Sequence, residues 1–132
     1  MTTIAIVDDH ELLRTGISAI IHGFEEYQVV AELDNGKSLT NFLKSNPTPD
    51  IILLDISMPI MDGYETSAWI KLNLLETKVL VLSMLENDGA IIRMLKNGAR
   101  GYILKDSNPK DFLRALNTIR DNGYFINELV SN

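Results

Sequence analysis

Cysteine is absent from the 132-residue chain, so the sequence has no disulfide framework and no thiolate metal site. No segment approaches the roughly 20 consecutive apolar residues that span a bilayer. The N-terminus also lacks a basic region followed by an apolar stretch. We therefore expect a cytoplasmic protein without membrane association.

Basic residues are few, with 12 Lys and Arg against 18 Asp and Glu and a formal net charge of -6. Duplex binding relies on cationic side chains that neutralise phosphates, so this segment is not expected to hold nucleic acid itself. Internal repeats and low-complexity tracts are also lacking, and 45% hydrophobic residues suit one domain with a proper core.

Short apolar runs alternate with stretches of helical spacing five times along the chain. The runs predict five strands, at residues 4–7, 29–33, 51–54, 79–82 and 101–104. Several are continuous rather than alternating, which suits strands covered on both faces. Between and after them, apolar residues at helical spacing predict amphipathic helices, the third with its stripe at Ala68, Ile70 and Leu74. This alternation predicts an α/β fold with a doubly wound, five-stranded parallel sheet and helices on both faces.

Polar side chains follow four of the predicted strands. Asp8 and Asp9 end the first run, Asp55 closes the third, and Ser83 and Lys105 follow the fourth and fifth. Alone, each has an ordinary interpretation as a helix cap, a turn residue or a solvated charge. Together they should meet at the carboxyl edge of the sheet, where open α/β folds bind ligands. A divalent cation between crowded carboxylates, with a hydroxyl and a lysine nearby, is typical of phosphoryl transfer.

Four segments occur in order at these strand ends: IAIVDDHELLRTG, IILLDISMPIMDGYE, VLVLSMLEND and GARGYILKD. They resemble the receiver domain of two-component response regulators, specifically the NarL/LuxR-type subgroup, over roughly residues 3–123. The resemblance implies a flavodoxin-like (CheY-like) fold with strand order 2-1-3-4-5. It also implies a signalling domain that is not classed as an enzyme, although it catalyses its own phosphoryl transfer and slow autodephosphorylation.

The resemblance further implies that Asp55 accepts a phosphoryl group from a sensor histidine kinase. Asp9 and Asp55 would ligate Mg²⁺ together with the backbone carbonyl of Ser57, and Asp8 would act largely through a metal-bound water. A carboxylate held by a metal and a lysine should stay ionised and can attack a phosphohistidine.

Ser83 and Lys105 would hold the phosphoryl oxygens, and Tyr102 would be the rotameric switch that turns inward when Ser83 moves. Leu85, with Ser57, would flank the path of an attacking water. Receivers often carry a proline after the lysine, and Asp106 stands there instead, so the isomer of that peptide is left open.

Two histidines and several large side chains are interpreted as structural. His10 is expected to cap or solvate the first helix rather than ligate a metal, and His22 is expected at the surface. A packing role is expected for a tryptophan and three methionines: Trp69, Met58, Met61 and Met84.

The resemblance divides the chain into a receiver at residues 1–123 and the start of a linker at 124–132. A helix-turn-helix output domain, absent from this chain, would supply any DNA contact, and phosphorylation would favour a homodimer. A stand-alone receiver, in a phosphorelay or binding a protein target, would share every site residue. A Mg²⁺-dependent phosphohydrolase of the haloacid-dehalogenase type is weaker, because Ser57 stands where its second carboxylate normally lies. A flavodoxin-like nucleotide binder is weaker again, because no glycine-rich loop follows the first strand.

Overall fold

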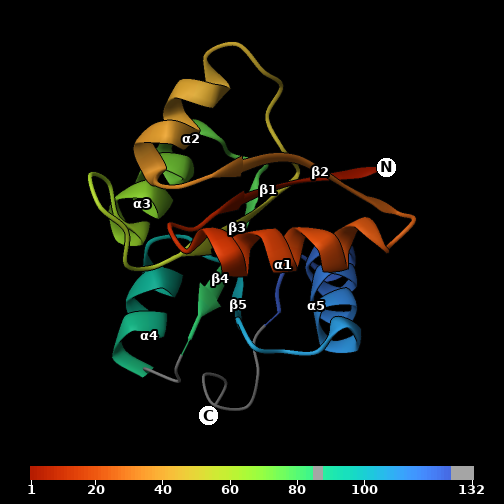
Figure 1. The fold of residues 1–132 in the computed structure, drawn as a ribbon. Helices are drawn as coiled ribbons and strands as arrows, with labels where there is room; N and C mark the ends of the chain where they lie inside the picture. The colour runs from red at the N-terminus through yellow and green to blue at the C-terminus, as the bar shows by residue number, and fades with distance from the viewer. Residues whose placement is uncertain (85–87, 126–132) are drawn as a thin grey trace.

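The computed structural model describes residues 1–84 and 88–125, in which strands and helices alternate along the chain. The strands are β1 (Thr2–Val7), β2 (Tyr27–Leu33), β3 (Ile51–Asp55), β4 (Lys78–Ser83) and β5 (Gly101–Leu104). The helices are α1 (Glu11–His22), α2 (Gly36–Leu43), α3 (Gly63–Asn73), α4 (Asp88–Lys96) and α5 (Pro109–Asn122). The strands form one parallel sheet in the order β2-β1-β3-β4-β5, which confirms the expected doubly wound topology (Figure 1).

The continuous apolar runs form the middle of the sheet. All five residues of β3 are buried, and in β1 and β4 only the first one or two positions are partly exposed. Three strands begin earlier than their apolar runs, because polar residues at their starts also pair: Thr2 aligns with Tyr27, and Ile51 with Lys78. The apolar runs therefore locate the C-terminal part of these three strands and miss the residues at their starts.

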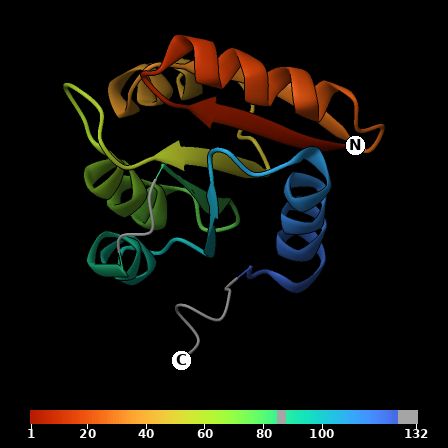
Figure 2. The ribbon, with the colours of Figure 1, turned by 60° about the horizontal axis from the view of Figure 1, so that its bottom comes forward.

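The helices cover the two faces of the sheet unequally. On one face, α1 and α5 pack on a core that includes Ile17, Ile21 and Phe112. On the other face, α2, α3 and α4 cover a second core that includes Leu39 and Ile91. Figures 1 and 2 show α4 and α5 on opposite sides of β4 and β5. The loops that follow the strands therefore line the carboxyl edge of the sheet, between the two groups of helices.

Polar side chains cap the starts of three helices. The Asn35 side chain accepts a hydrogen bond from Ser38 N (3.0 Å) at α2, and Asn108 accepts one from Asp111 N (2.8 Å) at α5. Asp62 caps α3 in a reciprocal capping box with Glu65. Such caps satisfy backbone donors that have no partner within the helix.

The predicted stripe of α3 is wrong in part. Ile70 is buried, but Ala68 is only partly covered and Leu74 lies at the C-cap. The other buried positions are Gly63, Thr66 and Ser67. The Thr66 hydroxyl donates to Asp62 O (2.6 Å), and the Ser67 hydroxyl donates to Asn97 O (3.0 Å). Small polar residues with satisfied hydroxyls can fill a buried helix face, and a purely apolar pattern does not detect them.

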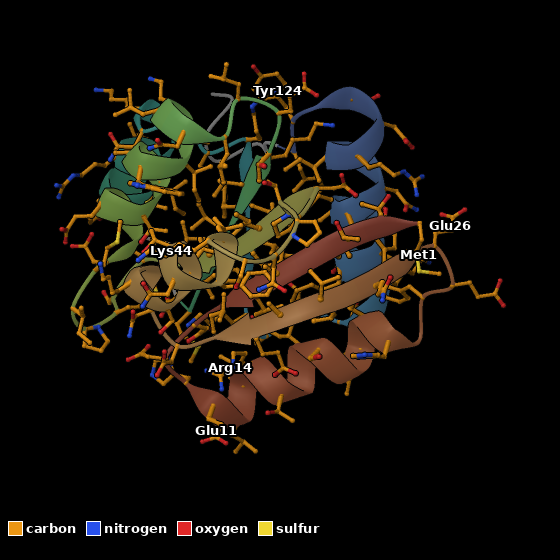
Figure 3. All side chains as sticks on the ribbon, turned by 90° about the horizontal axis from the view of Figure 1, so that it is seen from above. Met1, Glu11, Arg14, Glu26, Lys44 and Tyr124 are labelled. Carbon is orange, nitrogen blue, oxygen red and sulfur yellow. The ribbon has the colours of Figure 1, made fainter. Side chains whose placement is uncertain are left out.

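The described chain after α5 returns to the edge of the sheet. Gly123 ends α5 with a left-handed backbone (φ 87°), and Phe125 N then donates to Arg100 O (2.9 Å) beside Gly101 in β5. Tyr124 stacks with the Arg100 guanidinium, on the far side of the molecule from Glu11 (Figure 3). The remaining residues of the expected linker, 126–132, lie outside the described residues.

Membrane-spanning helices and cis peptides are both absent from residues 1–84 and 88–125. No helix among them combines the length and apolar character needed to cross a bilayer. They also contain no cis peptide, so the bond between Lys105 and Asp106 is trans.

Candidate functional site

Four strands deliver polar side chains to the carboxyl edge of the sheet. Asp8 follows β1, Asp55 ends β3, Ser83 ends β4 and Lys105 follows β5. All four are buried, with residue exposures of 0%, 6%, 6% and 4% respectively. The convergence predicted from the strand ends is therefore present in the fold, because parallel strands finish at the same edge.

Lys105 closes the site between two carboxylates. Its Nζ lies 2.7 Å from Asp8 Oδ2 and 3.1 Å from Asp55 Oδ1, and the lysine side chain is only 1% exposed. Its backbone N donates to Ser83 O (2.8 Å), which extends the pairing of β4 and β5. A buried ammonium requires such partners, because an uncompensated buried charge is strongly destabilising.

Asp55 has one oxygen engaged and one available. Its Oδ1 faces Lys105 and accepts a hydrogen bond from Ile56 N (2.8 Å). Its Oδ2 is buried and accepts no hydrogen bond from any described residue. Asp55 lines a cavity of about 360 Å³ together with His10, Ser57, Lys105 and others. A carboxylate that lines a cavity and keeps one buried oxygen without a partner is suited to a ligand or a cation.

The pKa of Asp55 is raised from 3.8 to about 6, mainly because burial disfavours its charged form. The nearby Asp8 raises it further, and Lys105 opposes both effects. Without a metal, the charge of Asp55 therefore depends on pH near 6. The expectation that a metal and Lys105 together keep Asp55 ionised stays a prediction. A bound cation would favour the ionised form.

Asp9 and His10 lie at the outer rim of the site. The Asp9 side chain is 33% exposed, and the His10 side chain is 62% exposed. His10 stands at the N-cap of α1 as expected, but its side chain makes no capping hydrogen bond. Its Nδ1 lies 3.2 Å from Asp8 Oδ1 and 3.6 Å from Asp9 Oδ1. The direction of this ring was not predicted, although the position of His10 directly after two carboxylates was a usable signal.

Arg14 supports the backbone behind these carboxylates. It lies on the side of α1 that faces β2, whereas Glu11 lies at the start of the helix (Figure 3). Its Nη1 donates to Asp8 O (2.7 Å), and its Nε lies 3.7 Å from Glu32 Oε1. Because Arg14 and Glu32 offset each other, the charge of the site is set by its own carboxylates and lysine.

The other predicted site residues are placed as follows. Ser57 is exposed and lines the cavity with Ser83. The Tyr102 ring is buried (1%) in the core on the α4 side. Met84 is 59% exposed, so the packing role expected for it is wrong. Leu85 lies outside the described residues.

Backbone strain occurs in the loop that connects β3 to α3. Ile60 has a φ of 69°, a left-handed conformation that is unfavourable for a β-branched residue, and Met61 N donates to Pro59 O across it (2.7 Å). The Ile60 side chain is 80% exposed. A strained loop beside a cavity is common at functional sites.

Gly63 anchors the other end of this loop beneath Asp55. Its N–H donates to Ile56 O (2.7 Å), and a Cβ at this position would overlap Asp55 O and lie 2.7 Å from Ile56 Cα. We expect Gly63→Ala to lower the free energy of unfolding by about 1–3 kcal/mol, as overpacking does, and to slow any chemistry at Asp55. Urea unfolding measures the first effect.

Gly16→Ala is the matched control, because a Cβ on this residue of α1 would meet no atom within 4 Å. We expect it to stabilise the protein by about 0.5–1 kcal/mol. Equal stability of wild type and Gly63→Ala would show that the backbone under Asp55 can move freely.

The donor set fits a hard divalent cation. Asp8, Asp9, Asp55 and His10 each offer a ligand atom, and these atoms lie within 4.8 Å of one another. Three carboxylates and one ammonium leave a net charge of -2 when all are ionised, and Asp55 Oδ2 lacks a partner among the described residues. Oxygen ligands with free coordination space are what Mg²⁺ prefers.

Comparison with known proteins identifies the family. The family model of the response regulator receiver domain matches residues 4–117, a stretch that contains all the site residues discussed above. The chain belongs to the response regulator receiver family. Within it, the chain is similar to NarL/LuxR-type regulators, and receivers of this kind are generally not classed as enzymes.

Two curated relatives show the extent of the likeness. The nitrate/nitrite response regulator protein NarL of Escherichia coli K12 is 40% identical over 114 residues, which cover 86% of this chain and 52% of NarL. The oxygen regulatory protein NreC of Staphylococcus epidermidis is 37% identical over 117 residues, covering 88% and 53%. The chain thus spans about half the length of these relatives.

Solved receiver structures agree in fold. The signal receiver domain of the response regulator NarL from Mycobacterium tuberculosis superposes with a TM-score of 0.82 at 31% identity, covering 91% of this chain and 97% of that one. The isolated receiver domain of RcsB from Salmonella enterica, with a beryllofluoride phosphomimetic, gives 0.86 at 28% identity, covering 98% and 96%.

Proposed function

We propose that Asp55 is the phosphoacceptor of this receiver and takes its phosphoryl group from a sensor histidine kinase with the help of Mg²⁺. The observation that carries the proposal is the Asp55 carboxylate, which lines a cavity and has one oxygen, Oδ1, held by Lys105 and the other, Oδ2, buried without a hydrogen-bond partner among the described residues. One oxygen is fixed and the other is positioned to attack.

In the proposed transfer, Asp55 Oδ2 forms a bond to phosphorus while the bond between phosphorus and the donor imidazole breaks. The donor ring leaves with the electron pair of that bond and takes up a proton. Lys105 stays beside Asp8 and holds a phosphoryl oxygen, and the Ser83 hydroxyl donates to another. Mg²⁺, held by Asp9, Asp55 and the Ser57 carbonyl, would neutralise charge that develops on the phosphoryl oxygens.

The direct test uses acetyl phosphate as donor and intact mass as readout. With Mg²⁺, the wild-type protein should gain one phosphoryl group, and chelation of the metal should prevent the gain. Absence of uptake with Mg²⁺, in protein shown to be folded by circular dichroism, would contradict the proposal.

Transcriptional control is the output that the relatives favour. Several are named response regulators or transcriptional regulatory proteins, and RcsB, similar in fold at 28% identity and a TM-score of 0.87, has been solved bound to DNA. We infer that residues 1–123 are the receiver and that residue 124 begins a linker to a DNA-binding output domain. A stand-alone receiver that binds a protein target is the alternative, and the length of the native reading frame distinguishes the two. The phosphohydrolase alternative gains no support, because exposed Ser57 stands where its second carboxylate would be needed.

The proposed output switch runs from Ser83 to Tyr102. Tyr102 aligns with Val81 in the sheet, and its buried ring belongs to the same core as Ile91 and Met94 of α4. A phosphoryl group that draws Ser83 inward would therefore act on a packed boundary between β5 and α4.

We expect beryllofluoride with Mg²⁺ to shift the protein toward dimers, with an affinity gain of about 5–150-fold, the range of typical allosteric couplings. Sedimentation at several concentrations measures the shift. Ser83→Ala should lose most of the gain, whereas Ser45→Ala, an exposed serine after α2, should keep it. Identical responses of wild type and Ser83→Ala would rule out the route through Ser83.

A further inference from the structure

His10 projects its ring over the carboxylates instead of over the end of its own helix. Its backbone N donates to Asp8 Oδ1 (2.9 Å), which fixes the residue beside β1. Its Nδ1 then lies 3.2 Å from the same oxygen and 3.6 Å from Asp9 Oδ1. The proposed phosphoryl transfer assigns no role to this imidazole.

A second observation points to a ligand at this place. The Asp55 side chain is only 8% exposed, and its Oδ2 has no hydrogen-bond partner among the described residues. His10 and Asp55 line the same cavity, and both belong to the group whose ligand atoms lie within 4.8 Å of one another. The imidazole and the Asp55 carboxylate therefore border one space.

The spacing of the ring and the carboxylates matches a tetrahedral metal site. Ligand atoms that lie 2.0–2.2 Å from a tetrahedral Zn²⁺ are separated from one another by about 3.3–3.6 Å. The separations from His10 Nδ1 to Asp8 Oδ1 and Asp9 Oδ1, 3.2 and 3.6 Å, are close to this size. The first is also a hydrogen-bond contact, which a bound ion would replace. Imidazole is a common ligand for Zn²⁺, Cu²⁺ and Ni²⁺, whereas Mg²⁺ is bound through oxygen ligands.

We propose that Asp8, Asp9, His10 and Asp55 form a binding site for a divalent transition-metal ion of the Zn²⁺ type, with His10 as the residue that selects it over Mg²⁺. The inference deepens the proposed function, on which it rests, because the two metals share Asp9 and Asp55. An ion bound by the imidazole and by Asp55 Oδ2 engages the oxygen that would attack phosphorus. Zn²⁺ therefore competes with Mg²⁺ and prevents phosphoryl uptake.

Calorimetric titration of the whole chain with ZnCl₂ and, separately, MgCl₂ tests the site. Wild type should bind Zn²⁺ more tightly than Mg²⁺. His10→Gln should weaken Zn²⁺ binding by at least about tenfold, the lower end of the losses seen even for groups behind metal ligands, and should leave Mg²⁺ binding unchanged. His22→Gln is the matched control, because exposed His22 is the last residue of α1, where its ring contacts Ser18 O (2.7 Å), away from the carboxylates.

Two spectroscopic measurements add to the calorimetry, and the first of them uses wild-type protein alone, so it does not depend on correct folding of His10→Gln. In wild type, Zn²⁺ should shift the ring nitrogen resonances of His10 and leave those of His22 in place. Co²⁺ should give the strong visible absorption of a tetrahedral ion, and this absorption should be lost in His10→Gln.

The outcomes separate this inference from the proposed function. Equal Zn²⁺ affinity of wild type and His10→Gln, or unshifted His10 resonances, would overturn the transition-metal site and leave Mg²⁺-dependent uptake at Asp55 intact. Zn²⁺ binding that depends on His10, in a protein that takes up no phosphoryl group with Mg²⁺, would support the metal site and contradict the proposed phosphoacceptor.

Discussion

Asp55→Asn is expected to abolish phosphoryl uptake and, at the same time, to stabilise the folded protein. An amide cannot attack phosphorus, and no other carboxylate of the described residues lines this cavity. The gain in stability follows from burial, which raises the pKa of Asp55 to about 6 from 3.8. One pKa unit corresponds to about 1.4 kcal/mol, so the charge costs the metal-free fold about 3 kcal/mol when fully ionised.

The sign of this effect sets its pH window. Above pH 6, Asp55 is charged in both the folded and the unfolded chain, and only the folded chain bears the cost of burial. As the pH falls from about 6 toward 4, the folded protein takes up a proton before the unfolded chain does, and the cost disappears. The advantage of Asp55→Asn should therefore be largest near pH 8 and shrink toward pH 4.

Urea unfolding at both pH values, without metal, measures this difference. Asp106→Asn is the control, because Asp106 is an exposed carboxylate next to Lys105. Undiminished phosphoryl labelling of Asp55→Asn would overturn the acceptor assignment, and a pH-independent gain in stability would show that burial of charge is not its cause.

The topology could be predicted because its signals are strong and local. Runs such as residues 51–54 are apolar on both faces, and turn and cap residues such as Asn35, Asp62 and Asn108 separate them. The inner face of α3 could not be predicted, because Thr66 and Ser67 are buried through hydrogen bonds to backbone carbonyls. A search for apolar periodicity does not detect these hydrogen-bonded polar residues.

The site was predictable as a set of residues but not as a geometry. Parallel strands bring Asp8, Asp55 and Lys105 to one edge whatever their rotamers, so their convergence follows from the order of the strands. The direction of the His10 ring and the exposure of Met84 depend on side-chain torsions and on the loops around them. The raised pKa of Asp55 depends on its burial and on the distance to neighbouring charges, which only coordinates provide.

The geometry also divides the roles of the two adjacent carboxylates, which leads to unequal effects on Mg²⁺ binding. Asp8 is fully buried, and both of its oxygens have protein neighbours: Lys105 Nζ at 2.7 Å and His10 N at 2.9 Å. The Asp9 side chain is 33% exposed, and its Oδ1 lies 3.6 Å from His10 Nδ1. Asp9 is therefore the better direct ligand for Mg²⁺, and Asp8 acts on that ion without contacting it directly.

Asp8→Asn is accordingly expected to weaken Mg²⁺ binding by about 10–100-fold, as loss of groups behind metal ligands does, and Asp9→Asn to weaken it further. Asparagine keeps the shape of each side chain, so the comparison isolates the lost charge. For wild type, Mg²⁺ affinity should fall as the pH drops below about 6, because protons then compete for Asp55. Calorimetry from pH 5 to 8 measures both effects. A larger loss in Asp8→Asn than in Asp9→Asn would place Asp8, rather than Asp9, next to the metal.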